Sequence, residues 1–147
     1  MMSLSRLFFI ACVMTFATGA VARSTPQAPL KIECGDFLRI LHKKPPRVVF
    51  SSCEFDKNRQ GKPLRAIYRV AGIHAASAES FLVRTVHLSR LRKSCCQWDS
   101  PSSQFTGKDG RAYIIYMMSP ETNVESRKQW GDIPSFEIVV ETLTEDI

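Results

Sequence analysis

A short apolar segment near the N-terminus constrains the fold most, because it decides in which compartment the cysteines are used. Arg6 precedes the apolar run 7–16, and small residues that end in Ala20, Val21 and Ala22 follow this run. A charged start, a short hydrophobic stretch and an A-x-A site are typical of a secretory signal peptide. The run is shorter than the roughly 20 residues of a membrane span. We therefore expect a signal peptide over 1–22, export, and no transmembrane anchor after its removal.

Removal of the signal peptide leaves enough chain for one hydrophobic core. Cleavage after Ala22 leaves 125 of the 147 residues. Only Arg6 of the 20 basic residues is lost, and none of the 14 acidic ones, so the formal net charge falls from +6 to +5. The composition excludes a disordered tail, a collagen and a polytopic membrane protein. Lipid attachment at Cys12 is the alternative interpretation of the N-terminus, but apolar sequence continues after this cysteine.

The mature chain keeps four cysteines, Cys34, Cys53, Cys95 and Cys96. An even number of cysteines in an oxidising compartment predicts disulfides. A bridge between adjacent residues is strained, so the favoured arrangement has two bridges from Cys95 and Cys96 to the other pair, with both crossings open. A zinc site is the alternative, yet the sequence lacks a C-x-x-C pair, which also argues against a thiol redox centre. We expect no metal and no cofactor.

Hydrophobic periodicity predicts a single α+β domain over 33–147, after an extended leader over 23–32. The patterns predict helices over about 34–43, 75–88 and 121–130. They predict strands over 47–56, 64–70, 111–118 and 135–144, with another strand that starts near Cys95. Hairpins and short connections favour an antiparallel sheet of about five strands with helices packed on one face, in the order α-β-β-α-β-β-α-β.

Two blocks of the chain resemble each other. The stretch 51–56 around Cys53 aligns with 94–99, which contains Cys95 and Cys96. The pair Arg65-Ala66 aligns with a later Arg-Ala pair at 111–112. In both blocks a predicted helix is followed by a strand, a turn with Gly-Lys and a returning strand. This order indicates an internal αββ duplication.

The candidate binding site is the basic segment between the second helix and the adjacent cysteines. Its residues are Arg84, Arg90, Arg92, Lys93 and Trp98. If disulfides pin this segment, the side chains are held on a rigid surface, as an interaction site requires. Arg65, Arg69 and Arg111 extend the same basic surface. The alternative is that Trp98 packs in the core and that the cations form a solvated helix end.

No catalytic residue is predicted. His42, His74 and His87 lie in no metal or nucleophile motif, and a cation in the position of His42 suits a helix C-terminus. The acidic residues of the turns and strand ends are common turn formers, and no spacing places two of them across a cleft. Disulfide formation would also leave no free thiolate for catalysis.

Three motifs carry a resemblance to a known family. They are CGDFL at 34–38, QGKPLRA at 60–66 with Tyr68-Arg69-Val70, and Cys95-Cys96 with Trp98-Asp99-Ser100. With these motifs the chain resembles an uncharacterised family of small exported bacterial proteins, a domain of unknown function, from about Cys34 to the C-terminus. The resemblance implies a bacterial source and an envelope or secreted location, with the four cysteines as structural residues. It implies no activity, cofactor or site.

These observations lead to two functional hypotheses. The first is a periplasmic or secreted, non-enzymatic binding module that recognises a protein or an acidic envelope component through its basic surface. An immunity or inhibitor protein against a secreted toxin is one form of it. Nucleic acid is not an expected partner, because no recognised binding motif is present. The alternative is a small periplasmic hydrolase that acts on envelope material, which would need a pocket with two facing carboxylates or a histidine with an acidic partner.

Overall fold

The computed structural model describes residues 32–145, so the predicted signal peptide, Cys12 and nearly all of the predicted leader lie outside the described residues. The elements follow one another as α1 (Phe37–Ile40), β1 (Val49–Phe55), β2 (Leu64–Ala71), α2 (Gly72–Val86), β3 (Arg92–Ser94), β4 (Gln97–Asp99), β5 (Ser103–Thr106), β6 (Ala112–Met118), the 3-10 helix η1 (Arg127–Asp132) and β7 (Ser135–Thr142). The predicted α+β class with an antiparallel sheet is confirmed. The described residues form seven strands where about five were expected.

The strands form one sheet in the order β1-β2-β7-β6-β4-β3, and β5 also pairs with β6. Each pairing is antiparallel. The hairpins β1–β2 and β5–β6 lie on either side of β7. Hairpin β1–β2 directly follows α1, but β3 and β4 stand between α2 and β5–β6, so the second block lacks the predicted αββ order. The alignment of the cysteines does not hold either. Cys53 lies in β1, whereas Cys95 and Cys96 form the turn of an additional hairpin, β3–β4.

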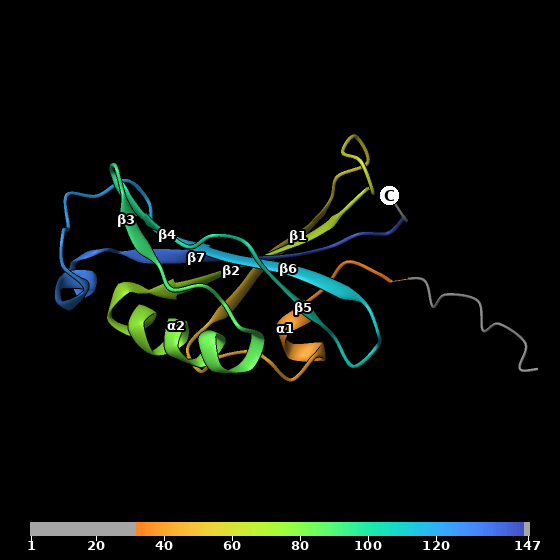
Figure 1. Ribbon diagram of the computed structural model, residues 1–147, viewed down its shortest axis with the longest axis horizontal. Coiled ribbons are helices and arrows are strands. Elements are labelled where there is room, and N and C mark those ends of the chain that lie inside the picture. The colour runs from red at the N-terminus through yellow and green to blue at the C-terminus, as the bar shows by residue number, and fades with distance from the viewer. Residues whose placement is uncertain (1–31, 146–147) are drawn as a thin grey trace, which may run out of the picture. The chain divides into compact units, whose positions relative to one another are not determined.

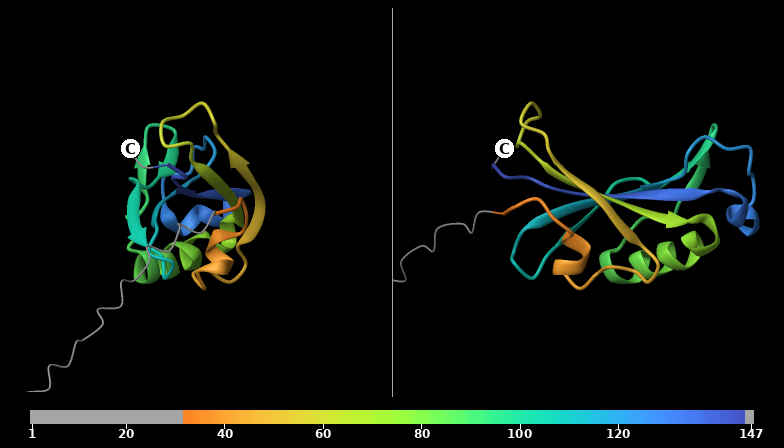
Figure 2. Two further views of the ribbon diagram at one scale, coloured as in Figure 1. Left: turned by 90° about the vertical axis from the view of Figure 1, so that its right-hand side faces the viewer. Right: turned by 180° about the vertical axis from the view of Figure 1, so that it is seen from behind.

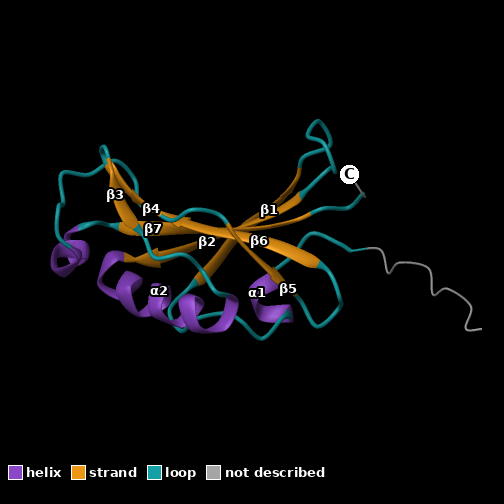
Figure 3. Ribbon diagram, in the orientation of Figure 1, coloured by secondary structure: helices purple, strands orange, loops and turns teal. Residues whose placement is uncertain are grey.

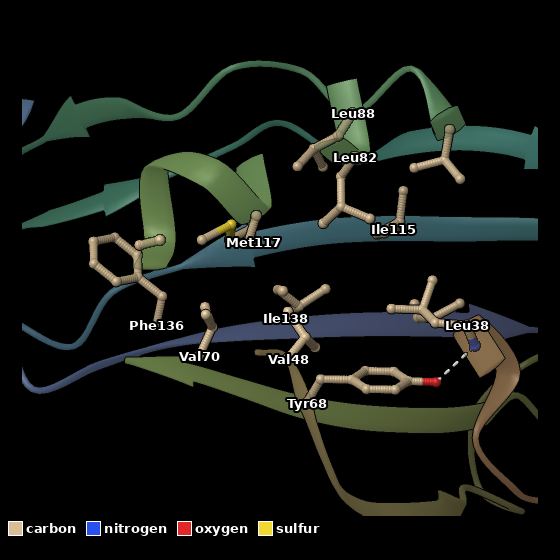
Figure 4. Close-up of a cluster of buried hydrophobic side chains, with 14 of the residues drawn as sticks. Leu38, Val48, Tyr68, Val70, Leu82, Leu88, Ile115, Met117, Phe136 and Ile138 are labelled. Atoms are coloured by element: carbon tan, nitrogen blue, oxygen red, sulfur yellow. Dashed lines mark hydrogen bonds between the residues drawn. The ribbon is translucent and has the colours of Figure 1, made fainter. Parts of the chain in front are cut away.

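Helices α1 and α2 cover one face of the sheet (Figures 1 and 3). Alternate residues of a strand point to opposite faces, and one set from β2, β6 and β7 is buried beneath these helices. Figure 4 shows this core, in which Leu82 of α2 and Leu38 of α1 pack toward the sheet. The core residues from β2, β6 and β7 are Leu64, Ala66, Tyr68, Val70, Tyr113, Ile115, Met117, Phe136, Ile138 and Val140. Burial of each large apolar side chain stabilises the fold by about 1.5–3 kcal/mol.

The helices differ in length from those predicted. Helix α1 has only one turn. It begins after Asp36, whose side chain accepts a hydrogen bond from the Arg39 amide. It ends before His42, whose backbone is left-handed with a φ of 56°. Helix α2 begins at Gly72 and ends where His87 adopts a left-handed conformation with a φ of 57°. The prediction of a helix over 121–130 is wrong. Only the short 3-10 helix η1 forms, and Ser126 is its N-cap residue.

The predicted disulfide pairing is also wrong. Cys34 is bonded to Cys53, which ties the segment before α1 to the middle of β1. Cys95 and Cys96 are exposed thiols. The sheet order explains the difference, because β1 and β3 are the two ends of the strand order. Five strand spacings of about 4.8 Å separate them, far beyond the usual Cα–Cα distance of about 4.4–6.8 Å in a disulfide.

Among the described residues, no helix has both the length and the apolar character needed to cross a membrane.

Candidate functional site

The structure separates the residues of the predicted basic segment. Trp98 is only 6% exposed, and its indole nitrogen donates a hydrogen bond to the carbonyl of Val124 at 2.9 Å. The Lys93 ammonium donates to the carbonyls of Thr122 and Val124 at 2.6 and 3.2 Å. Both side chains therefore hold the segment 122–124 against the β3–β4 hairpin. The expectation that they lie on a free binding surface is corrected.

Arg90 takes part in an ion cluster around a buried carboxylate that the sequence did not reveal. At its centre is Glu79, whose side chain is 2% exposed. Arg127 donates to both Glu79 oxygens, at 2.7 and 3.1 Å, and to the carbonyl of Leu91. Its guanidinium also stacks on the rings of Trp98 and Trp130. Arg90 lies 3.7 Å from Glu79. This cluster fastens η1 and the start of β3 to α2.

The two remaining arginines of the predicted site do not share a face. Arg84 is exposed on α2, on the helix-covered side of the sheet. Arg92 pairs with Asp99 across the β3–β4 hairpin, one position away from Lys93 and Trp98. Because side chains alternate along a strand, Arg92 points to the opposite side of the sheet from Trp98. The predicted basic patch is thus divided between two sides.

The opposite side of the sheet carries no helix (Figures 1 and 2). The loop between β1 and β2 rises at one end of this side, and the β3–β4 hairpin rises at the other. We call the outward side chains of β2, β7 and β6 the open face. They are Arg65, Ile67, Arg69, Glu137, Val139, Glu141, Ile114, Tyr116 and Met118.

The register arranges the open face in three rows. The middle row is Ile67, Val139 and Tyr116, and it is apolar apart from the tyrosine hydroxyl. On one side of it, Arg65 lies beside Glu141. On the other side, Arg69 lies beside Glu137 in the same way. Val139 is 0% exposed, so the accessible part of this apolar row is Ile67 and Tyr116, which lie between two rows of opposite charges.

Glu141 is the centre of a hydrogen-bonded network on this face. Its side chain is 7% exposed, although no helix covers it. Arg59, from the β1–β2 loop, binds both carboxylate oxygens at 3.2 Å. The Nε of Arg65 lies 3.2 Å from Oε1, and its Nη2 donates to the Tyr116 hydroxyl at 3.1 Å. The tyrosine hydroxyl lies 3.4 Å from Glu141 and donates to it.

The network changes the proton affinity of both arginines. The hydrogen bond and the negative charge of Glu141 raise the pKa of Arg59. Burial alone would lower the pKa of Arg65, but the contacts with Tyr116 and Glu141 outweigh burial and raise it. Both guanidinium groups are therefore fixed cations that are held in place by one carboxylate.

Two surface hollows flank the apolar row. The first has a volume of about 300 Å³ and is lined by Glu54, Phe55, Asp56, Arg59, Arg65, Tyr116 and Glu141. The second has a volume of about 360 Å³ and is lined by Arg69, Met118, Ser119, Pro120, Ser135 and Glu137. Both are at the small end of the range for ligand pockets. Their size suits single side chains of a partner better than a large cofactor.

The first hollow contains carboxylates but no arrangement that favours acid–base catalysis. Both oxygens of Glu141 are occupied by ion pairs with Arg59 and Arg65. Glu54 is exposed, and Asp56 caps the following turn through the Asn58 amide. Over residues 32–145 no group of three or more His, Cys, Asp or Glu side chains is placed to hold a metal ion.

A family model matches slightly more than half of the chain. The model describes a domain of unknown function, DUF4952, and it matches residues 22–98. The chain belongs to this family. The matched part includes α1 to β3 and ends at Trp98 in β4, whereas the sequence motifs suggested a resemblance up to the C-terminus. No curated protein and no solved structure matches the chain.

The sequence of this DUF4952 protein predicted only part of the open face. The alternation along β2 indicated a basic face with Arg65 and Arg69. The matching signal lies in β7, where Glu137 and Glu141 have the same spacing of four residues. Antiparallel strands with equal spacing can pair such charges, but the sequence does not show that β2 and β7 are neighbours. Arg59 gave no signal, because it lies in a loop.

Proposed function

We propose that the protein is an exported bacterial binding module that binds a protein segment on its open face. The network of Arg59, Arg65, Tyr116 and Glu141 carries the proposal. Arginine and tyrosine are enriched among the residues that dominate binding energy. Side chains that are already ordered lose little conformational entropy when a partner binds. An ordered cluster of these residue types, on a sheet face without a covering helix, suits binding better than it suits folding alone.

The chemistry of the open face favours a partner that combines carboxylates with apolar side chains. Arg59 remains 53% exposed while it binds Glu141, so it keeps donors for a second carboxylate. Arg69 is exposed, and within the described part of the chain no ion pair involves it. Ile67 and Tyr116 between them offer apolar contact. The formal net charge of +5 on the chain without residues 1–22 attracts an acidic partner over longer distances.

Three observations support export from the cytoplasm. The disulfide between Cys34 and Cys53 is typical of an oxidising compartment. The N-terminal sequence has the features of a signal peptide. The domain is also small and stapled, as many secreted modules are. An immunity or inhibitor protein that covers the acidic site of a toxin is one concrete form of this function.

The alternative of an envelope hydrolase has less support. Such an enzyme needs two groups with different proton affinities at one reacting bond. The most buried carboxylate of the first hollow, Glu141, forms ion pairs with two arginines, which occupy its oxygens. His42 and His87 lie at the C-terminal ends of α1 and α2, where each has a left-handed backbone conformation and an exposed side chain.

Site-specific photo-crosslinking tests the proposed function. A benzophenone amino acid replaces Ala71, which is exposed at the end of β2, and in a matched control it replaces Ala76, which is exposed on α2. Each purified protein is irradiated in an envelope extract, and the cross-linked peptide is identified by mass spectrometry. We expect a discrete adduct from position 71, with Asp or Glu beside apolar residues in the partner peptide.

Charge variants make the test specific. Arg59→Ala should reduce the yield of the adduct, and so should 1 M salt, which shortens the screening length to about 3 Å. Arg84→Ala, on α2, should leave the yield unchanged. Equal adducts from positions 71 and 76, a basic partner peptide, or no adduct at position 71 would each overturn the proposal.

A further inference from the structure

The turn of the β3–β4 hairpin consists of two adjacent cysteines. Ser94 pairs with Gln97, so Cys95 and Cys96 are the two turn residues. Both are exposed, and Cys95 has a left-handed φ of 49°. The carbonyl of Cys96 accepts a hydrogen bond from the Thr122 amide at 2.6 Å, and the Lys93 ammonium binds the Thr122 carbonyl at the same distance. The turn therefore has a fixed attachment at its base and free thiols at its tip.

No other cysteine of the described chain can react with these thiols. Cys34 and Cys53 are bonded to each other at the other end of the strand order. Within residues 32–145, Cys95 and Cys96 can form a disulfide only with each other or with another molecule.

We propose that Cys95 and Cys96 are a reversible thiol–disulfide pair that closes a vicinal disulfide by exchange with a disulfide-bearing molecule. One cysteine thiolate attacks the disulfide R–S–S–R, whose sulfur–sulfur bond breaks and releases the first thiol RSH. The second cysteine then attacks the mixed disulfide and releases the second RSH. Two electrons pass from the cysteine pair to the two R–S groups, and the two thiol protons end on the two RSH molecules. A dithiol reverses the reaction.

The geometry explains why the closed form should open easily. Adjacent Cα atoms are about 3.8 Å apart across a trans peptide, below the usual range of about 4.4–6.8 Å for a disulfide. A bridge that short is strained, and strained, exposed disulfides are more easily reduced than structural ones. Exposure at the tip of a hairpin also gives an exchange partner access to either sulfur.

The two thiols also interact before they react. Hydrogen bonding to Cys95 and the negative charge of that neighbour raise the pKa of the Cys96 thiol. The two sulfurs thus lie close enough to interact directly, as a bridge between them requires.

Peptide mapping in glutathione redox buffers tests the pair. The mature protein is equilibrated at a series of thiol-to-disulfide ratios, blocked with N-ethylmaleimide and digested with trypsin without reduction. Lys93 and Lys108 bound a tryptic peptide, 94–108, that contains only these two cysteines. In oxidising buffer we expect this peptide to be two hydrogens lighter than the dithiol and free of maleimide. In reducing buffer we expect two maleimide groups.

The disulfide between Cys34 and Cys53 provides an internal reference. Its tryptic peptides are 32–39 and 48–57, so it is detected in the same digest. Because structural disulfides resist the glutathione pool, the 94–108 bridge should open at a ratio at least ~10-fold less reducing. Cys96→Ser should not close, and Cys95 should then carry a single glutathione, with thermal unfolding unchanged.

Several results would overturn the inference. These are stable glutathione adducts or links to a second chain on the wild-type peptide 94–108, full alkylation of that peptide in oxidising buffer, and a bridge that survives when the Cys34–Cys53 disulfide is reduced. None of these results bears on binding at the open face, so the two proposals can fail separately.

Discussion

Removal of the Glu79 carboxylate should be among the most destabilising single changes in this domain. Glu79→Ala removes two hydrogen bonds from Arg127, at 2.7 and 3.1 Å, and one from the Leu91 amide at 2.8 Å. Breaking a buried ion pair by removing one partner costs about 3–5 kcal/mol. The Arg127 side chain is 38% exposed, so water recovers part of this loss. The Leu91 amide stays buried without its acceptor, which costs about 1–3 kcal/mol. We expect a net loss of about 3 kcal/mol.

Urea unfolding followed by tryptophan fluorescence measures this loss, because Trp98 and Trp130 both contact Arg127. The matched control is Glu125→Ala. Glu125 also pairs with a cation, Lys93, but its side chain is 74% exposed. Exposed pairs contribute about 0–1 kcal/mol, so the control should lose at most that amount. Equal losses for the two variants, or a loss below about 1 kcal/mol for Glu79→Ala, would refute the argument from burial.

Three further changes test other parts of the fold by the same unfolding measurement. Gly72→Ala should cost about 1–3 kcal/mol, because a Cβ there would collide with the carbonyl oxygens of Trp130 and Ile133. The control Gly35→Ala should be near neutral, because the nearest side-chain atom to its new Cβ lies 3.9 Å away. Tyr68→Phe should cost about 1–3 kcal/mol, because the phenol oxygen accepts a hydrogen bond from the buried Leu38 amide at 2.9 Å (Figure 4). A smaller loss would mean that a water molecule takes the place of the phenol oxygen as the acceptor. Cys53→Ser opens a loop with a sequence separation of 19 and should cost about 3 kcal/mol, a result that the reduced wild type should reproduce.

The fold elements that were predicted well have a strong local pattern. The alternation in β2 and β7 places Tyr68 and Ile138 in the core, as expected for strands with one buried face. The segment 121–130 shows the opposite case. Its backbone at Thr122 and Val124 is bound by Lys93, Trp98 and Cys96, and these tertiary hydrogen bonds hold it away from a helix. The propensity of a segment cannot reveal such partners, since they come from another part of the chain.

The candidate site was predictable only in part, for the same reason. Arg65 and Arg69 stand out as a basic face of a strand, because the signal lies within eight residues. Their relation to Glu141 depends on β2 and β7 being neighbours, which a chain separation of more than 70 residues conceals. Trp98 illustrates the converse. Its position beside a basic segment suggested a surface, but it packs against Trp130 at a centroid distance of 5.3 Å.

The sequence alone determined the class of the fold, the strand faces, the turns and the presence of cysteines suited to disulfides. These properties depend on residues close together in the chain, whose periodicity and turn chemistry act locally. Only the tertiary structure decided which cysteines pair, which cations stay exposed and which carboxylate the arginines hold. Those outcomes depend on the order of strands in the sheet. That order brings Arg59, Arg65 and Glu141 into one network and places Cys53 and Cys95 at opposite ends of the strand order.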